Sequence, residues 1–141
     1  MTVCLDEAIG APMAQVLRML RAPAAAHLCS VAELGLRGKS DDVLLPELGR
    51  RGCTALVTFD SSMLRASVRH DAWRASGVSV FLWGGDAGNL SKFEKARTLI
   101  WRWPAIVEQI EAGPRGGAWH VPLDPRKDGL TRLYPTESDS I

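Results

Sequence analysis

Short apolar runs alternate with helix-like segments along this chain, and that order limits its fold more than any other feature. Four runs are apolar enough to be buried strands, and the segments between them carry apolar residues at helical spacing. Parallel strands need a crossover connection, usually a helix, so the alternation favours a parallel sheet with helices on both faces. The sequence therefore predicts a three-layer α/β domain with a central parallel sheet flanked by helices. The predicted strands are Thr2–Leu5, His27–Val31, Thr54–Thr58 and Val78–Leu82.

The segments between and after these strands predict the helices. Pro46 should kink the second helix, and Pro104 should break or kink the last one near Trp103, because proline removes a backbone donor. Ser91 and Glu94 have the spacing of a capping box, which marks the start of that last helix. The helices are predicted at Ala8–Leu20, from Asp41 to about Arg51, at Met63–Ala75, and from Ser91 to about Glu111.

The length of the chain, 141 residues, is that of one domain, and 46% of the residues are hydrophobic. This is enough to bury a sizeable core. We expect the domain to span residues 1–123 and to end in an edge strand at Ala118–Leu123. Residues 124–141 are polar and contain two prolines, which predicts a loosely ordered C-terminal tail.

Charge and composition exclude several classes of protein. The net charge of +1 argues against a protein that binds polyanions over its whole surface, so contact with nucleic acid must come from local patches. Cys4, Cys29 and Cys53 form no CxxC pair, which predicts reduced thiols and no zinc site. No apolar run approaches the about 20 residues that span a bilayer. We therefore expect a cytoplasmic protein with no membrane partner.

Three aspartates are expected to meet at one edge of the sheet. Asp6 and Asp60 follow predicted strands, and right-handed crossovers bring the carboxyl ends of parallel strands to the same edge. Asp41 begins a predicted helix, and it joins the other two if the loop before it reaches that edge. Clustered carboxylates repel one another unless a cation lies between them. Mg²⁺ or Mn²⁺, which prefer oxygen ligands, would fill this role.

Each acidic residue also has a structural interpretation. Asp6 and Asp60 could cap the helices that follow them, and Ser40 or Asp41 is a natural N-cap of the helix that begins there. Asp42 would add favourable charge at the same helix N-terminus, and Glu7 could be a solvated neighbour of Asp6.

The segments around these aspartates resemble the PIN-like nucleases, and more closely the VapC-related and uncharacterised PIN-like toxins of bacteria. Those families open with a strand that ends in Asp-Glu, as at Leu5-Asp6-Glu7. They continue with an Asp before an apolar helix, a glycine before the next strand, and Thr-x-Asp at its end. The corresponding segments are Asp41-Asp42-Val43-Leu44-Leu45, Arg51-Gly52 and Thr58-Phe59-Asp60, and the resemblance covers about residues 2–82.

The resemblance implies a ribonuclease that uses Mg²⁺ or Mn²⁺, with Asp6, Asp41 and Asp60 as metal ligands and catalytic residues. It also implies the toxin of a type II toxin–antitoxin pair, with RNA as substrate, a cognate antitoxin as partner and a homodimer as the assembly. Many relatives place a second acid two residues after the strand-end Asp, whereas this chain has Ser62. Glu7 or Asp42 could then be an auxiliary ligand.

Basic residues after Asp60 are the predicted contacts for RNA phosphates. Arg65 and Arg69 are four residues apart on a predicted helix and would share a face, while Lys92 and Lys95 lie at the start of the last helix. A solvated helix face is the structural alternative. In the last helix, Trp101 and Trp103 on either side of Arg102 would suit the core of a dimer interface.

Two other functions fit the same pattern. The first is a catalytically silent PIN-like domain that binds RNA or a protein partner. The second is a receiver-like or haloacid-type phosphotransfer domain, which also gathers aspartates at a sheet edge. That chemistry would need a lysine on a late strand, and none lies near Val78–Leu82. The first alternative would bind RNA without cutting it when metal is added.

Overall fold

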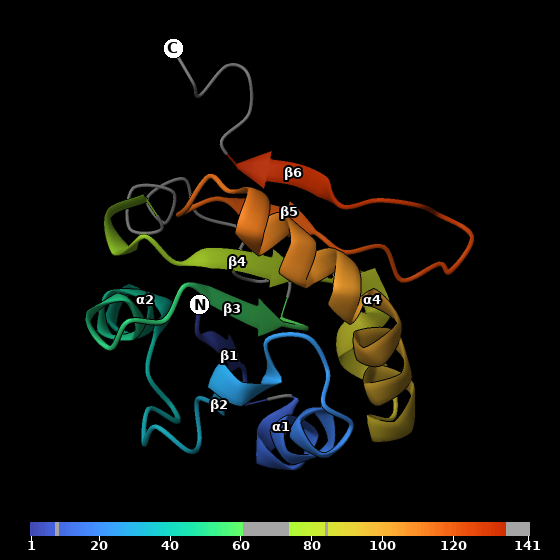
Figure 1. Ribbon diagram of the computed structural model, residues 1–141, viewed down its shortest axis with the longest axis horizontal. Coiled ribbons are helices and arrows are strands. Elements are labelled where there is room, and N and C mark those ends of the chain that lie inside the picture. Colours follow the sequence, from blue (N-terminus) through green and yellow to red (C-terminus); the bar gives the residue numbers. More distant parts are fainter. Residues whose placement is uncertain (8, 61–73, 84, 135–141) are drawn as a thin grey trace.

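A six-stranded sheet forms the centre of the molecule in the computed structural model, which describes residues 1–7, 9–60, 74–83 and 85–134 (Figure 1). The strand order is β2-β1-β3-β4-β5-β6. Pairing is parallel from β2 through β5, and β6 runs antiparallel to β5. The strands are β1 (Val3–Leu5), β2 (Leu28–Ser30), β3 (Ala55–Thr58), β4 (Ser79–Leu82), β5 (Ala118–His120) and β6 (Thr131–Tyr134).

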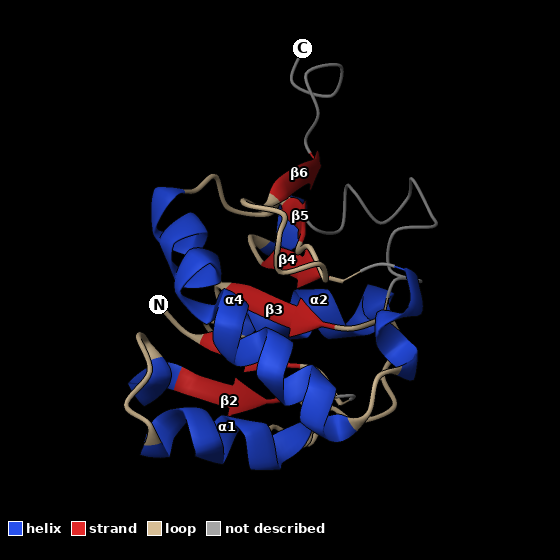
Figure 2. Ribbon diagram, turned by 90° about the vertical axis from the view of Figure 1, so that its right-hand side faces the viewer, coloured by secondary structure: helices blue, strands red, loops and turns tan. Residues whose placement is uncertain are grey.

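Helices cover both faces of the sheet, which confirms the predicted α/β class. Buried residues of α1 and α4 belong to one hydrophobic core and those of α2 to the other. In Figure 2, α4 lies in front of β3 and α2 lies behind it. The helices are α1 (Gly10–Met19), α2 (Asp41–Arg50) and α4 (Lys92–Ala112), with short 3-10 helices η1 (Ala25–His27) and η3 (Gly85–Asn89).

Strand residues alternate between the two cores, because successive side chains of a strand point to opposite faces. Val3 and Leu5 lie in the core with α1 and α4, whereas Cys4 lies in the core with α2. On β3, Val57 lies in the core with α1 and α4, and Leu56 lies in the core with α2. Both faces are therefore buried, which explains why the strands appear in the sequence as continuous apolar runs rather than alternating ones.

Both internal prolines lie within helices that continue past them. Pro46 is inside α2, and α4 runs as one helix through Pro104, so the helix does not break near Trp103. Each proline removes one backbone donor, but buried residues on both sides of it hold the helix against the sheet. In α4 these are Leu99 and Trp103 on one side and Ile106 and Val107 on the other.

The chain beyond Asp124 is more ordered than its polar composition predicts. β6 pairs with β5, so β5 is not the edge strand that was expected. The buried guanidinium of Arg102 donates to the backbone oxygens of Pro122 at 3.1 Å and of Asp124 and Lys127 at 2.8 Å each. The Arg102 side chain therefore holds the loop between β5 and β6 against α4. The predicted boundary at residue 123 therefore falls inside the folded part of the chain.

The expected interface of Trp101 and Trp103 around Arg102 is wrong for two of its three residues. Trp103 is buried, and its indole N–H donates to the backbone oxygen of Pro23 at 2.7 Å. Arg102 is occupied by the backbone contacts just described. Of these three residues, only Trp101, which is 65% exposed, remains available for an interface.

The helix predicted at 63–75 lies almost entirely outside the described residues, which show helix at residues 74–76. Within the described ranges, no helix has the length and apolar character needed to cross a bilayer.

Candidate active site at the carboxyl edge of the sheet

Asp6 and Asp60 meet around the side chain of Thr58. Asp6 directly follows β1, and its backbone N–H donates to the oxygen of Val57 at 3.0 Å, which continues the pairing of β1 with β3. Since Leu5 pairs with Val57, Asp6 lies beside Thr58. The Thr58 hydroxyl donates to Asp6 Oδ2 at 2.6 Å and accepts from the Asp60 N–H at 3.0 Å. One buried hydroxyl thus links the ends of two adjacent parallel strands.

The Asp6 carboxylate sits in an environment that opposes its charge. Burial raises the pKa of Asp6 above its ordinary value, and the negative charges of Glu7 and Asp60 raise it further. Hydrogen bonds from the Thr58 hydroxyl and the Glu7 backbone N–H lower the pKa and offset part of this effect. A cation at this position would relieve both the repulsion between the carboxylates and the loss of hydration.

The loop that precedes α2 reaches the same edge. The Gly38 N–H donates to Glu7 Oε1, so residues between β2 and α2 contact the residue that follows Asp6. Asp41 begins α2 three residues after Gly38 and lies at the helix end nearest to this contact. The backbone of Asp41 therefore starts beside the carboxyl edge, and the side chain of Asp41 lies outside the described part of the structure.

Two of the capping interpretations do not match the helix termini. The N-cap residue of α1 is Ile9 and not Asp6, although the Asp6 backbone oxygen accepts from the Ile9 N–H at 3.1 Å. Of the two N-cap candidates for α2, Ser40 is the N-cap residue, and Asp41 is the first residue inside the helix. Asp42 follows on α2 and is exposed. The helix that Asp60 was expected to cap, and Ser62, lie outside the described residues.

The donor chemistry of this edge suits a hard divalent cation. Asp6 and Asp60 offer carboxylate oxygens, which Mg²⁺ and Mn²⁺ prefer over nitrogen or sulfur ligands. Among the side chains that the structure describes, no group of three or more His, Cys, Asp or Glu residues could by itself hold a metal ion. The predicted triad takes its third carboxylate from Asp41, so that triad stays a prediction.

Positive charge lies next to the acidic edge. Lys92 and Lys95 of α4 line a pocket of about 360 Å³ together with Glu7, the residue that follows Asp6. The Lys95 ammonium lies 5.8 Å from the centre of the Phe59 ring, and Phe59 separates Thr58 from Asp60 in the sequence. Lys92 and Lys95 therefore bring positive charge close to the residues that flank Asp6 and Asp60. Arg65 and Arg69 lie outside the described residues.

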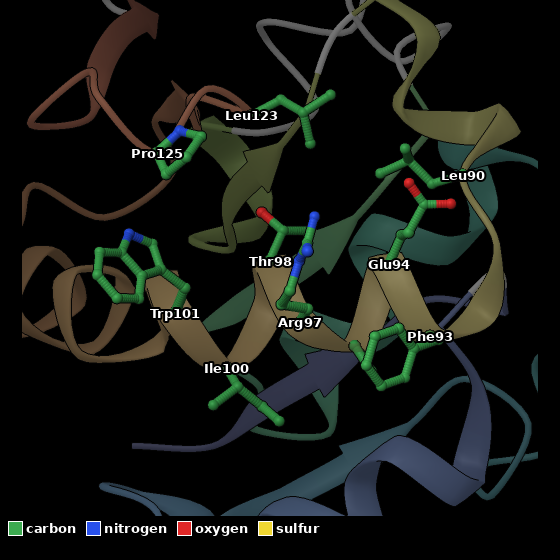
Figure 3. Close-up of a pocket in the computed structure, with 10 residues that line it drawn as sticks. Leu90, Phe93, Glu94, Arg97, Thr98, Ile100, Trp101, Leu123 and Pro125 are labelled. Atoms are coloured by element: carbon green, nitrogen blue, oxygen red, sulfur yellow. The ribbon is translucent and has the colours of Figure 1, made fainter.

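A second, larger hollow lies along the outer face of α4, and we call it the α4 groove (Figure 3). It has a volume of about 800 Å³ and is mostly apolar. The loop after β5 closes one side with Leu123 and Pro125. The residues of α4 that line it include Phe93, Ile100 and Trp101, which are exposed, and the charged pair Glu94 and Arg97.

The sequence pattern predicts the carboxylates of this site but not the groups that position them. Thr58 was recognised only as part of a motif, although it lies two residues before Asp60, the spacing that puts two strand residues on one face. The contact of Gly38 with Glu7 had no local signal, because it joins residues 31 positions apart. The position of Lys95 over Phe59 depends in the same way on how α4 packs.

The comparisons with known proteins agree with this geometry. Residues 1–85 match the family model described as a PIN like domain, and this range contains β1 to β4 with Asp6, Asp41 and Asp60. No curated protein and no solved structure matches the chain significantly. PIN domains are generally nucleases, and a nucleic-acid ligand fits both the acidic edge and the adjacent lysines. Because the match covers more than half of its length, the chain belongs to the family of PIN-like domains.

Proposed function

We propose that this PIN-like domain is a metal-dependent endoribonuclease that acts as the toxin of a type II toxin–antitoxin pair. The observation that carries the proposal is the Thr58 hydroxyl, which contacts Asp6 and the backbone of Asp60 at the carboxyl edge of the sheet. A structural role alone would not require two carboxylates next to each other at the ends of adjacent strands. Their mutual repulsion favours a site that is completed by a cation.

In this proposal, Asp6 and Asp60 hold Mg²⁺ or Mn²⁺, with Asp41 as the expected third ligand and Glu7 and Asp42 as auxiliary carboxylates. When bound, the ion supplies a Lewis acid that activates water and offsets the charge that builds up on the phosphate oxygens.

The residues of the chain perform the remaining tasks. The Thr58 hydroxyl fixes the orientation of the Asp6 carboxylate and also ties it to the backbone of Asp60. Burial raises the pKa of Asp6, and a cation bound beside its carboxylate would favour the charged form. Lys92 and Lys95 bind phosphates of the RNA that enters past Glu7, which compensates for the negative charge of the site itself.

Metal titration with an RNA substrate tests this function. The purified full-length chain, treated with EDTA, should leave a fluorescent single-stranded RNA intact, and Mg²⁺ or Mn²⁺ should restore cleavage. RNA binding without cleavage at any metal concentration would instead identify the catalytically silent domain. An EDTA-resistant activity that persists in Asp6→Asn would contradict the proposed metal site, because the cutting would not depend on it.

A toxin of this class would act in the cytoplasm on cellular RNA, with an antitoxin protein as its partner. A reading frame for a small DNA-binding protein beside the gene would support this role. Co-expression with that protein should suppress RNA cleavage, and unchanged cleavage by the purified complex would contradict the pairing.

We also propose that the α4 groove is the homodimer contact. Phe93, Ile100 and Trp101 follow the spacing of one helix face, and Glu94 and Arg97 lie beside them. In a twofold interface the same surface meets itself, so Arg97 of one copy can pair with Glu94 of the other. The pattern of opposite charges around an apolar row therefore favours a second copy of this chain as the occupant.

A further inference from the structure

Two cysteines face each other across neighbouring strands. The register of β1 and β2 pairs Cys4 directly with Cys29. Adjacent strands lie about 4.8 Å apart, which falls within the range of about 4.4–6.8 Å that separates the Cα atoms of disulfide-bonded cysteines. Cys4 belongs to the core on the α2 side of the sheet, and Cys29 packs against the same core. Both side chains therefore leave the sheet on one face and next to each other.

The thiols are close enough to interact. The Cys29 thiol donates to the backbone oxygen of Val3, the residue before Cys4, at 3.7 Å, and Cys53 lies shortly before β3. All three are free cysteines. Within the described part of the chain these thiols do not belong to a group that could hold a metal ion. Their proximity therefore points to chemistry between sulfur atoms rather than to metal binding.

Cys29 is the reactive member of the cluster. It is partly exposed, whereas Cys4 and Cys53 are buried, so an oxidant from solvent meets Cys29 first. Arg18 lies beside it, because its guanidinium donates to the backbone oxygen of Leu28 at 2.8 Å and pairs with Glu33 at 3.2 Å. The neighbouring thiols and the charge of Arg18 lower the pKa of Cys29. Its thiolate, the nucleophilic form, is thereby favoured.

We propose that Cys29 and Cys4 form a redox-active pair that hydrogen peroxide converts into a disulfide. The Cys29 thiolate attacks one peroxide oxygen, so that an S–O bond forms and the O–O bond breaks. The departing hydroxide takes up a proton and leaves as water, and Cys29 becomes a sulfenic acid. The Cys4 sulfur then attacks the Cys29 sulfur, the S–S bond forms, and the S–O bond breaks. The hydroxide leaves as water with the proton of Cys4.

The disulfide would join an edge strand to the strand that carries the active site. β2 lies at the end of the sheet order and pairs only with β1 in that sheet. Asp6 follows β1 directly, two residues after Cys4. The oxidised protein should therefore resist unfolding of β2 more strongly than the reduced one. This inference does not depend on the proposed nuclease activity.

Peptide mapping of the full-length protein tests the pair. The reduced wild type is treated with hydrogen peroxide, the remaining thiols are blocked with N-ethylmaleimide, and the digest is analysed by mass spectrometry. We expect a crosslinked peptide pair that contains Cys4 and Cys29, lighter by two hydrogen atoms than the sum of the reduced peptides, with Cys53 alkylated. The melting temperature of the oxidised form should be higher and should return to the reduced value with dithiothreitol.

Single serine variants provide the controls. Cys53→Ser should form the crosslink as the wild type does, whereas Cys29→Ser should keep both remaining thiols alkylatable. Cys4→Ser should trap the sulfenic acid of Cys29, which dimedone labels. The proposal is overturned if the wild-type crosslink joins Cys29 to Cys53, if peroxide leaves all three thiols alkylatable, or if Cys29→Ser loses thiols as fast as the wild type. The wild-type map decides the question even where a variant does not fold.

Discussion

The hydroxyl of Thr58 donates a hydrogen bond of 2.6 Å to the carboxylate of Asp6, across the junction of two parallel strands. The same oxygen accepts from the backbone of Asp60, so it cannot turn away without losing both contacts. Thr58 is fully buried, which means that no water can easily replace its hydroxyl. The position of the acidic edge is therefore set by a neutral side chain.

Replacing either carboxylate should separate catalysis from folding. Asp6→Asn and Asp60→Asn should each abolish metal-dependent RNA cleavage. The melting temperature of the metal-free protein should hold or rise, because each change removes repulsion between acidic side chains. Calorimetry in EDTA and a cleavage assay measure the two effects. Asp128→Asn, a change at an exposed acid in the loop before β6, is the matched control and should alter neither. A clear fall in melting temperature would mean that the aspartates are structural.

Removing the Thr58 hydroxyl should weaken the site without removing a carboxylate. Thr58→Val keeps the shape of the side chain but loses its donor to Asp6, and the free energy of unfolding should fall by about 1–2 kcal/mol. The Mn²⁺ concentration needed for half-maximal cleavage should increase. Thr58→Ser keeps the hydroxyl and should retain most of the metal response. Equal metal requirements for the valine and serine variants would show that the hydrogen bond does not orient Asp6.

The buried Asp6 should make the metal-free protein less stable as pH rises. Because the pKa of Asp6 is raised in the folded state, the folded protein keeps this proton at pH values where the unfolded chain has lost it. The associated stabilisation is present below the ordinary Asp pKa of about 4 and is lost as pH rises through the folded value. Melting curves in EDTA should show this loss in the wild type and not in Asp6→Asn. Parallel curves for the two proteins would contradict it.

Neutralising the lysines beside the site should weaken RNA binding in a salt-dependent way. For single strands, each phosphate contact contributes about 0.7 to the slope of log affinity against log salt. Lys92→Gln with Lys95→Gln should therefore lower the slope by about 1.4 and leave Mn²⁺ binding unchanged. Arg115→Gln with Lys127→Gln removes the same charge elsewhere and should have little effect. A wild-type slope in the lysine variant would place the RNA path along other residues, such as Arg65 and Arg69.

Self-association should depend on Trp101. The wild type should sediment as a dimer at micromolar concentration, and Trp101→Glu should shift it to the monomer, because a charge would be buried in the α4 groove. Met19→Glu is the control, since Met19 is 82% exposed on α1 and does not line that groove. A monomeric wild type would refute the proposed dimer. Dissociation of the Met19 variant alone would place the contact on α1.

The strands were predictable because burial on both faces leaves continuous apolar runs. The parallel arrangement then places Asp6 and Asp60 at one edge without further information. The strand β6 was missed because the chain around it is polar, although Asp128-Gly129 is a turn signal and Gly129 has a φ of 79°. This turn sends the chain back along β5.

Arg102 and Trp103 illustrate what the sequence alone does not determine. Local spacing placed both on a helix, but their partners are backbone oxygens at positions 20 to 80 residues away. Such contacts follow from how α4 packs and leave no periodic pattern. The continuation of α4 through Pro104 has the same origin, since tertiary packing overrides the cost of one lost hydrogen bond.

Because β4 pairs with β5, the segment that matches the family model should not fold stably by itself. The match ends at residue 85, yet the Phe81 ring stacks on Trp119 with the ring centres 5.4 Å apart, and the Trp83 indole donates to Thr98 at 3.1 Å. A fragment cut at residue 85 would expose these aromatic rings and a bare strand edge, which is the geometry that invites aggregation. The residues after 85 therefore complete the fold of the segment that matches the family model, since they supply both the strand that pairs with β4 and the helix that covers Trp83.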